Sequence, residues 1–251
     1  MEVYLSPMIP KPLFFALIEQ ILQSGWKPKT DKVAQSSISA QDWKFYGTDP
    51  KMVLSQQNEG SDFSIFMSND RIPRDLKGKK FVITFDNSIE KLRNCTIFHV
   101  HDLLSYDSTL HHSNVIDRWL QGQSFNEEVR THYWVSPRDV SDAIVGCLRI
   151  VKLPNLIEIC GRRGWTLEET RREFNLLFSR WQQSKTGDFS KESLFVKDLP
   201  IMIQPYAGEP PNRPNLEPLH ALLLQNRVDG WRPYVPLRTM LMELIASIEK
   251  M

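Results

Sequence analysis

The chain has 251 residues, a formal net charge of +1 and a hydrophobic content of 41%. These values are typical of a globular protein with a large core, in one domain or in one domain with a small lobe. The near-zero net charge argues against a nucleic-acid partner, which requires clustered excess Lys and Arg. The longest apolar run, residues 13–18, is too short to cross a bilayer, so membrane insertion is not expected. The three cysteines lie among apolar residues and no basic segment follows Met1, which predicts a reduced, cytoplasmic protein without a signal peptide.

Short apolar strands alternate with helical patterns in the first half of the chain. Residues 2–6 are predicted to form a strand, and Phe14–Leu22 carries an apolar stripe at helical spacing, with Gly25 as its C-terminal stop. Three further strands and a short helix are predicted at 62–67, 81–85, 96–100 and 49–57. Strands that alternate with helices predict an α/β fold with a parallel sheet.

The second half of the chain is predicted to be mainly helical. Ser136 and Thr166 each precede an amphipathic helix and have an acidic residue three positions later, the pattern of an N-terminal cap. A strand is predicted at 156–160, and a last amphipathic helix begins at Leu237. Residues 183–214 are predicted to be an irregular, proline-bearing extension.

Several short motifs follow one another in collinear order along nearly the whole chain. They are Gly47–Pro50, Glu59–Met67, Arg130–Val135 with Asp139–Ala143, Ile157–Gly161 with Thr166–Glu169, Arg213–Pro214, and Gly230–Pro233. Together with the strand, loop and helix of residues 3–25, they resemble the extended short-chain dehydrogenase/reductases, the NAD-dependent epimerase/dehydratase family that acts on nucleotide sugars. The resemblance implies a trimmed Rossmann-like parallel sheet in residues 1–150 and a small, mainly helical C-terminal lobe in residues 151–251 that corresponds to the family's substrate-binding part.

The chain departs from this family at the positions that carry its chemistry. The glycine-rich turn, which lets a dinucleotide diphosphate approach the backbone, is here Ser6–Pro12, without glycine and with three prolines. None of the six tyrosines has a lysine four residues later, so the catalytic Tyr-x-x-x-Lys pair is missing. The connections at 68–80 and 86–95 are too short for the family's two long central helices. We therefore expect no catalytic residues and no bound cofactor.

Two arginines and a group of histidines are the remaining candidates for ligand binding. Arg130 and Arg213 match positions where family members place arginines on the diphosphate of the sugar nucleotide, a role that suits the planar guanidinium. His99 and His101 would share one face of a strand, close in sequence to Asp102, His111 and His112. Because no second anchored pair of ligands follows at a defined spacing, the sequence predicts no metal site.

The short central connections predict that one face of the sheet lacks its usual helices. Parallel strands are normally covered on both faces, so the uncovered face should bind a protein partner or a second copy of the chain. The residues expected on this face are Phe63, Phe66, Phe81, Phe85 and Phe98. The most favoured function is a non-catalytic binding or assembly subunit that retains a nucleotide-sugar site. An atypical nucleotide-sugar epimerase or dehydratase, acting alone or with a complete homologue, is the alternative, and a sensor of sugar nucleotides is a third reading.

Overall fold

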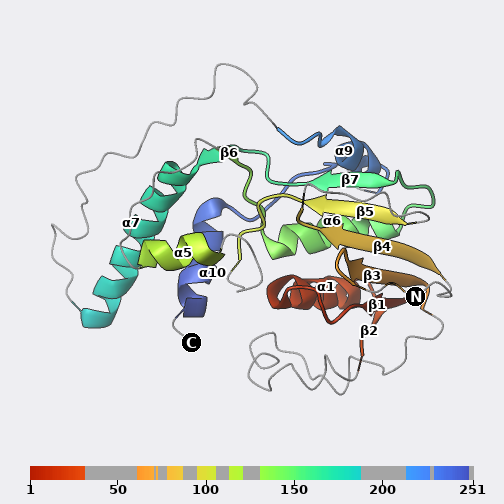
Figure 1. Cartoon of the computed structure of the whole chain (residues 1–251), viewed down its shortest axis with the longest axis horizontal. Helices are drawn as coiled ribbons and strands as arrows, with labels where there is room; N and C mark the ends of the chain where they lie inside the picture. Colours follow the sequence, from red (N-terminus) through yellow and green to blue (C-terminus); the bar gives the residue numbers. More distant parts are fainter. Residues whose placement is uncertain are drawn as a thin grey trace.

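A computed structural model describes residues 1–31, 61–70, 72, 78–86, 95–105, 113–120, 131–187, 213–226 and 229–248. Its centre is a six-stranded parallel sheet in the order β2-β1-β3-β4-β5-β7 (Figure 1). The strands are β1 (Glu2–Leu5), β2 (Lys27–Lys29), β3 (Phe63–Met67), β4 (Lys79–Thr84), β5 (Thr96–Val100) and β7 (Leu156–Ile159). The predicted α/β, Rossmann-like fold is therefore confirmed.

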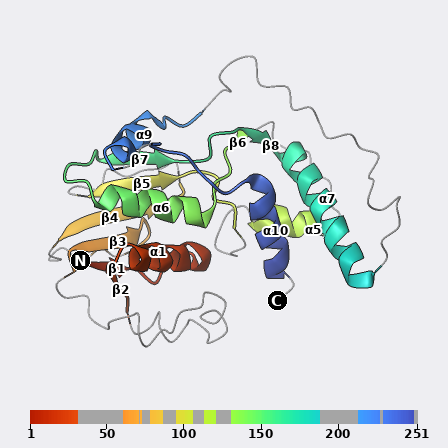
Figure 2. The same ribbon diagram turned by 180° about the vertical axis from the view of Figure 1, so that it is seen from behind.

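Two helices cover one face of this sheet. Helix α1 (Lys11–Gln23) begins with a proline in its first turn and ends before Gly25, whose φ of 73° suits a residue without a side chain. Helix α6 (Pro137–Leu148) begins at Ser136, whose hydroxyl accepts a hydrogen bond from the N–H of Asp139. The two helices lie side by side over the sheet (Figure 2) and are joined by a 3.0 Å hydrogen bond between Gln20 and Asp142.

The core between these helices and the sheet is apolar throughout. Helix α9 (Glu217–Leu224) contributes to the same core beside β7. From the strands, this core takes Val3, Leu5, Phe63, Ile65, Met67, Phe81, Ile83, Phe98, Val100, Ile157 and Ile159. Because side chains alternate along a strand, the intervening residues point to the opposite face of the sheet. That second face is more polar, with buried Tyr4, Ser64, Phe66, Val82, Thr84, Ile97 and His99.

The predicted phenylalanine surface is corrected by this alternation. Phe63, Phe81, Phe85 and Phe98 all pack in or against the core under α1 and α6, and only Phe66 belongs to the second face. Phe66 is itself only 3% exposed. The expectation that the five residues form one uncovered face is therefore wrong, because residues of odd and even position on one strand point to opposite sides.

A second core lies beyond the carboxyl ends of β5 and β7 (Figure 1). It is formed by α5 (Ser113–Leu120), α7 (Leu167–Thr186) and α10 (Leu237–Ile248), next to the two-stranded antiparallel sheet of β6 (Thr131–His132) and β8 (Trp165–Thr166). Helix α7 has the predicted capping box of Thr166 and Glu169. It continues to Thr186 and ends at Gly187, so the predicted irregular extension does not begin at Gln183.

Both cores draw on residues beyond position 150. Ile157, Leu219 and Leu223 pack in the core of the sheet, whereas Phe174 and Leu241 pack in the second core. Because residues beyond position 150 belong to both cores, the cores do not mark a boundary at that residue, and the division there stays a prediction. The predicted helix at 49–57 lies outside the described residues.

Candidate functional site at the carboxyl edge of the sheet

The loop after β1 lies where an open parallel sheet usually binds its ligand. The strand that follows β1, β2, lies on one side of it, and the next strand, β3, lies on the other side. This reversal makes the carboxyl edge at β1 a topological switch point. In the loop, the N–H of Ser6 donates to the carbonyl of Ile65 at 2.9 Å, and the N–H of Met8 donates to the Ser6 hydroxyl at 3.1 Å. The N–H of Ile9 donates to the carbonyl of Ser6 at 3.3 Å. Pro7 and Pro10 have no N–H to offer.

These contacts decide whether a dinucleotide fits the loop. The cofactor of this fold requires backbone N–H groups that face its diphosphate and glycines that let it come close. Here the N–H groups of Ser6, Met8 and Ile9 are already used within the protein. The loop after β1 therefore does not fit a dinucleotide diphosphate.

An acidic residue follows β2, at a place where this fold commonly binds the ribose of a dinucleotide. Asp31 accepts a 2.9 Å hydrogen bond from the hydroxyl of Tyr4, which comes from β1. Burial, together with this hydrogen bond, raises the pKa of the Tyr4 phenol well above its ordinary value. Tyr4 consequently stays protonated and occupies one oxygen of Asp31.

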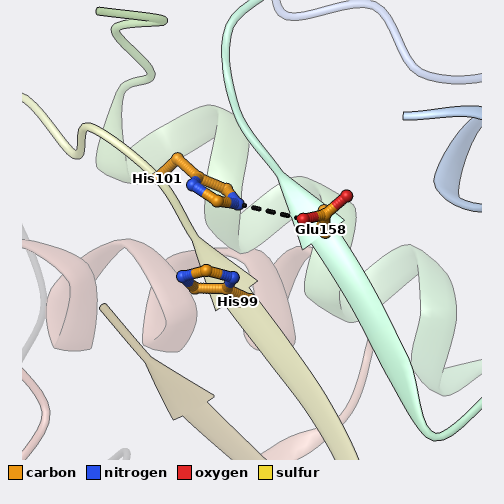
Figure 3. Close-up of side chains that lie close together, drawn as sticks. All are labelled: His99, His101 and Glu158. Atoms are coloured by element: carbon orange, nitrogen blue, oxygen red, sulfur yellow. Dashed lines mark ion pairs between the residues drawn. The ribbon is translucent and has the colours of Figure 1, made fainter. Parts of the chain in front are cut away.

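The carboxyl ends of three neighbouring strands carry a row of polar side chains. Register pairs Thr84 of β4 with His99 of β5, and His99 with Glu158 of β7. His101, two residues beyond His99, points to the same side, and the two imidazole centroids are 3.9 Å apart. Its Nε2 lies 3.4 Å from Oε1 of Glu158 (Figure 3). The other Glu158 oxygen, Oε2, accepts a hydrogen bond from the N–H of Asn215 at 2.6 Å.

His99 is buried, with 4% of its surface exposed. Burial, and then the neighbouring His101, lower the pKa of His99 to about 4, although the carboxylates of Glu158 and Asp86 oppose this. Its imidazole is therefore neutral near pH 7. His99, His101 and Glu158 offer two nitrogens and an oxygen that lie within 4.8 Å of one another.

The sequence predicts the shared face of His99 and His101 but not the participation of Glu158. Glu158 is separated from them by more than fifty positions and joins the group only because β7 pairs directly with β5. A polar residue near the end of an otherwise apolar strand is the signal that points to it. His111 and His112 lie outside the described residues.

Asp102 attaches the neighbouring segment to this edge. Its φ of 48° is unusual for a residue with a side chain, and its carboxylate accepts a 2.8 Å hydrogen bond from the N–H of Tyr133. The same carboxylate lies 3.1 Å from Nδ1 of His132, whose ring stacks on Trp134. We interpret these contacts as the anchor of residues 131–135, because Gly161 also donates its N–H to Tyr133 at 2.9 Å.

The two predicted phosphate ligands are not both described. Arg130 lies outside the described residues, immediately before β6. Arg213 is exposed and stands two residues before Asn215, the donor to Glu158. Burial and the carboxylates of Asp102 and Glu158 raise the pKa of the Cys160 thiol, and the charge of Arg213 opposes them. The main chain beside Arg213 therefore reaches the carboxyl edge of the sheet, and the pairing of the two arginines stays a prediction.

Comparison with known proteins gives a clear result for the fold. No protein-family model and no curated protein matches the sequence. Among solved structures, UDP-N-acetylglucosamine 4-epimerase from Bacillus cereus aligns over 99% of both chains, with a TM-score of 0.57 and 9% identity. UDP-glucose 4-epimerase from Thermotoga maritima aligns over 100% of this chain and 99% of its own, with a TM-score of 0.53 and 12% identity. The Bordetella bronchiseptica enzyme WbmG, solved with NAD, aligns over 100% and 94%, with a TM-score of 0.52 and 11% identity.

These alignments define the class of fold. The chain has the Rossmann-like fold of NAD-dependent nucleotide-sugar epimerases and dehydratases, and the alignments span at least 99% of it. The resemblance seen in the sequence motifs is thereby confirmed at the level of the fold. Within the described residues, no helix is both long enough and apolar enough to cross a bilayer.

Proposed function

We propose that this protein is a non-catalytic member of the nucleotide-sugar epimerase fold, which binds a sugar nucleotide without turning it over and acts as a binding or assembly subunit. The loop after β1 carries this proposal. Its prolines and its internal hydrogen bonds remove donors that the diphosphate of NAD, which the matching WbmG structure contains, would need. A hydride-transfer enzyme of this fold depends on that cofactor.

The sequence gives independent support for the proposed loss of catalytic activity. Each of the six tyrosines lacks a lysine four positions later. Tyr4 is buried, and its hydroxyl is bonded to Asp31. Tyr133 is buried beside Asp102. Neither tyrosine therefore has the exposed phenol that acid–base catalysis in this family needs.

The ligand proposal rests on the arginine at the carboxyl edge. We propose that the diphosphate of a sugar nucleotide contacts Arg213 and Arg130, because guanidinium groups bind phosphate with paired hydrogen bonds. A protein partner or a second copy of the chain stays part of the proposal, on a surface other than the five phenylalanines. We also propose the cytoplasm as its compartment, because Cys95, Cys147 and Cys160 carry no disulfide.

Calorimetry with NAD and NADP, and thermal shift with UDP-, GDP-, dTDP- and CDP-sugars, test the proposal together. We expect no dinucleotide binding and a rise of the melting temperature with at least one sugar nucleotide. Arg213→Ala should weaken that ligand about ten- to a hundredfold, because a charge-assisted hydrogen bond is worth about 1.5–3 kcal/mol. The matched control is Arg180→Ala, on the exposed part of α7.

Each outcome is informative. Micromolar binding of NAD, or NAD that copurifies with the protein, would contradict the loss of the cofactor site. A panel without any shift, or a shift that Arg213→Ala leaves unchanged, would contradict the sugar-nucleotide site. Turnover of the bound sugar nucleotide would show that the protein is an enzyme. Light scattering of the purified protein tests self-association, and a pull-down from the native host tests for a partner.

A further inference from the structure

The ends of β5 and β7 hold three side chains with the chemistry of metal ligands. His99 and His101 come from one strand and its exit, and Glu158 comes from the adjacent strand at the same register (Figure 3). Their ligand atoms lie within 4.8 Å of one another. Since two rigid, paired strands supply the residues, the grouping follows from the backbone and not from a chance contact of surface side chains.

The state of His99 argues that this grouping has a ligand. Only 4% of the surface of His99 is exposed, and its Nε2 has no hydrogen-bond partner. A buried polar atom without a partner costs about 1–3 kcal/mol, so most such atoms in native proteins are bonded. Bonding of this nitrogen to an ion would remove the cost.

The distances suit a small divalent ion. Two ligands of a tetrahedral zinc ion, with bonds of about 2.0–2.1 Å, lie about 3.3 Å apart. The separation of Nε2 of His101 and Oε1 of Glu158 is 3.4 Å. All the ligand atoms lie within 4.8 Å of one another, so one ion can contact all three side chains after local adjustment.

The surroundings also suit an ion with an open coordination position. The side chains of His101 and Glu158 keep 15% and 26% of their surface exposed, while His99 is buried, so the ion would lie where the interior meets solvent. The hydrogen bond from Asn215 to Oε2 of Glu158 orients the carboxylate, as outer residues do for metal ligands. Three protein ligands that include two imidazoles and one carboxylate are the set found in zinc sites that keep one position for water or substrate.

We propose that His99, His101 and Glu158 bind one divalent transition-metal ion, with zinc as the favoured ion. This site is independent of the proposed sugar-nucleotide function and requires neither Arg213 nor a dinucleotide. The nitrogen-rich ligand set favours zinc and its neighbours over magnesium or calcium, which prefer oxygen.

The experiment uses the full chain, freed of metal with a chelator and then titrated with Zn²⁺ in competition with a chromophoric chelator. We expect one zinc ion per chain, a higher melting temperature with zinc, and a visible absorption band when Co²⁺ replaces it. His101→Gln and Glu158→Gln should each weaken zinc binding by about tenfold or more. Loss of a residue that only orients a ligand already costs about this much, and these two residues are the ligands themselves. Both positions are partly exposed, so these variants should fold, which circular dichroism checks.

The matched control is Glu19→Gln, an exposed glutamate on α1 that should bind zinc like the parent protein. A parent protein that retains no zinc at micromolar free metal would overturn the proposal. Zinc binding that both His101→Gln and Glu158→Gln leave unchanged would also overturn it, because the ion would then sit elsewhere, for example at His111 and His112.

Discussion

Asp139 joins the two cores of the molecule, and its removal should cost more stability than any other single charge on α6. Its Oδ1 accepts the N–H of Tyr234 at 2.7 Å, and its Oδ2 accepts the N–H of Val235 at 3.3 Å. The hydroxyl of Ser136 donates to the same Oδ2 at 2.8 Å. Asp139 therefore fastens the start of α6, which lies on the sheet, to the segment that enters α10 in the second core.

The size of the effect of Asp139→Ala follows from these contacts. The short bond to Tyr234 is a charge-assisted hydrogen bond, worth about 1.5–3 kcal/mol when buried, while the longer bond to Val235 contributes less. Both N–H groups are only partly buried, so water recovers part of the loss. A negative charge in the first turn of a helix adds about 0.3–1 kcal/mol. The N-terminal cap itself survives, because the hydroxyl of Ser136 accepts the backbone N–H of residue 139. We therefore expect Asp139→Ala to lower the free energy of unfolding by about 2–3 kcal/mol.

Equilibrium unfolding in urea, followed by tryptophan fluorescence and by far-ultraviolet circular dichroism, measures this loss. The control is Asp142→Ala on the same helix, whose carboxylate bonds the side chain of Gln20 and should cost about 1 kcal/mol or less. Asp139→Asn keeps an acceptor for Tyr234 and should lie between the parent and Asp139→Ala. Equal losses for Asp139→Ala and Asp142→Ala would refute the reasoning, because the contact between the two cores would then carry no particular weight.

Three further substitutions or reagents test other parts of the structure. A Cβ at Gly161 would lie 2.2 Å from the carbonyl oxygen of Trp134, so Gly161→Ala should lower the free energy of unfolding by about 3 kcal/mol. The control, Gly25→Ala, meets only open space at a positive φ and should cost about 1 kcal/mol. Equal costs would contradict the close approach at Gly161. Thr166→Ala removes the capping box of α7 and should lower the free energy of unfolding by about 1 kcal/mol, so an unchanged value would show that the cap contributes nothing. Cys147 and Cys160 are buried, and burial raises the pKa of the Cys160 thiol. Neither should therefore react with iodoacetamide near neutral pH until the protein unfolds. Rapid labelling of the native protein would contradict their burial.

The local elements were largely predictable from the sequence because their signals are local. The apolar stripe of α1 and the cap of α7 each occupy a few consecutive turns, and the structure places them as expected. The strands β3 and β5 are also predictable, because short runs of β-branched and aromatic residues between polar segments favour strands. The end of α7 is less predictable, because the polar residues Gln183–Thr186 continue the helix without an apolar stripe to indicate it.

The candidate site was only half predictable because it depends on register between strands distant in sequence. His99 and His101 could be assigned to one face from their spacing alone. Placing Glu158 beside them required knowing that β7 pairs with β5, and that the residue opposite His99 is Glu158. The prediction that the five phenylalanines share one face fails for a more local reason, because Phe63 and Phe66 are three residues apart on one strand and face opposite sides.

The chemistry of the two sheet faces explains why the candidate sites lie where they do. The face under α1 and α6 is mainly apolar and packs in the core of the sheet. The opposite face carries Thr84, His99 and Glu158 in one row at the carboxyl edge, although burial of such groups without partners is unfavourable. The connections at 68–78 and 85–95 are shorter than the dozen or more residues that a helical crossover normally needs. Side chains with the chemistry of ligands therefore gather on the more polar face of the sheet, at its carboxyl edge.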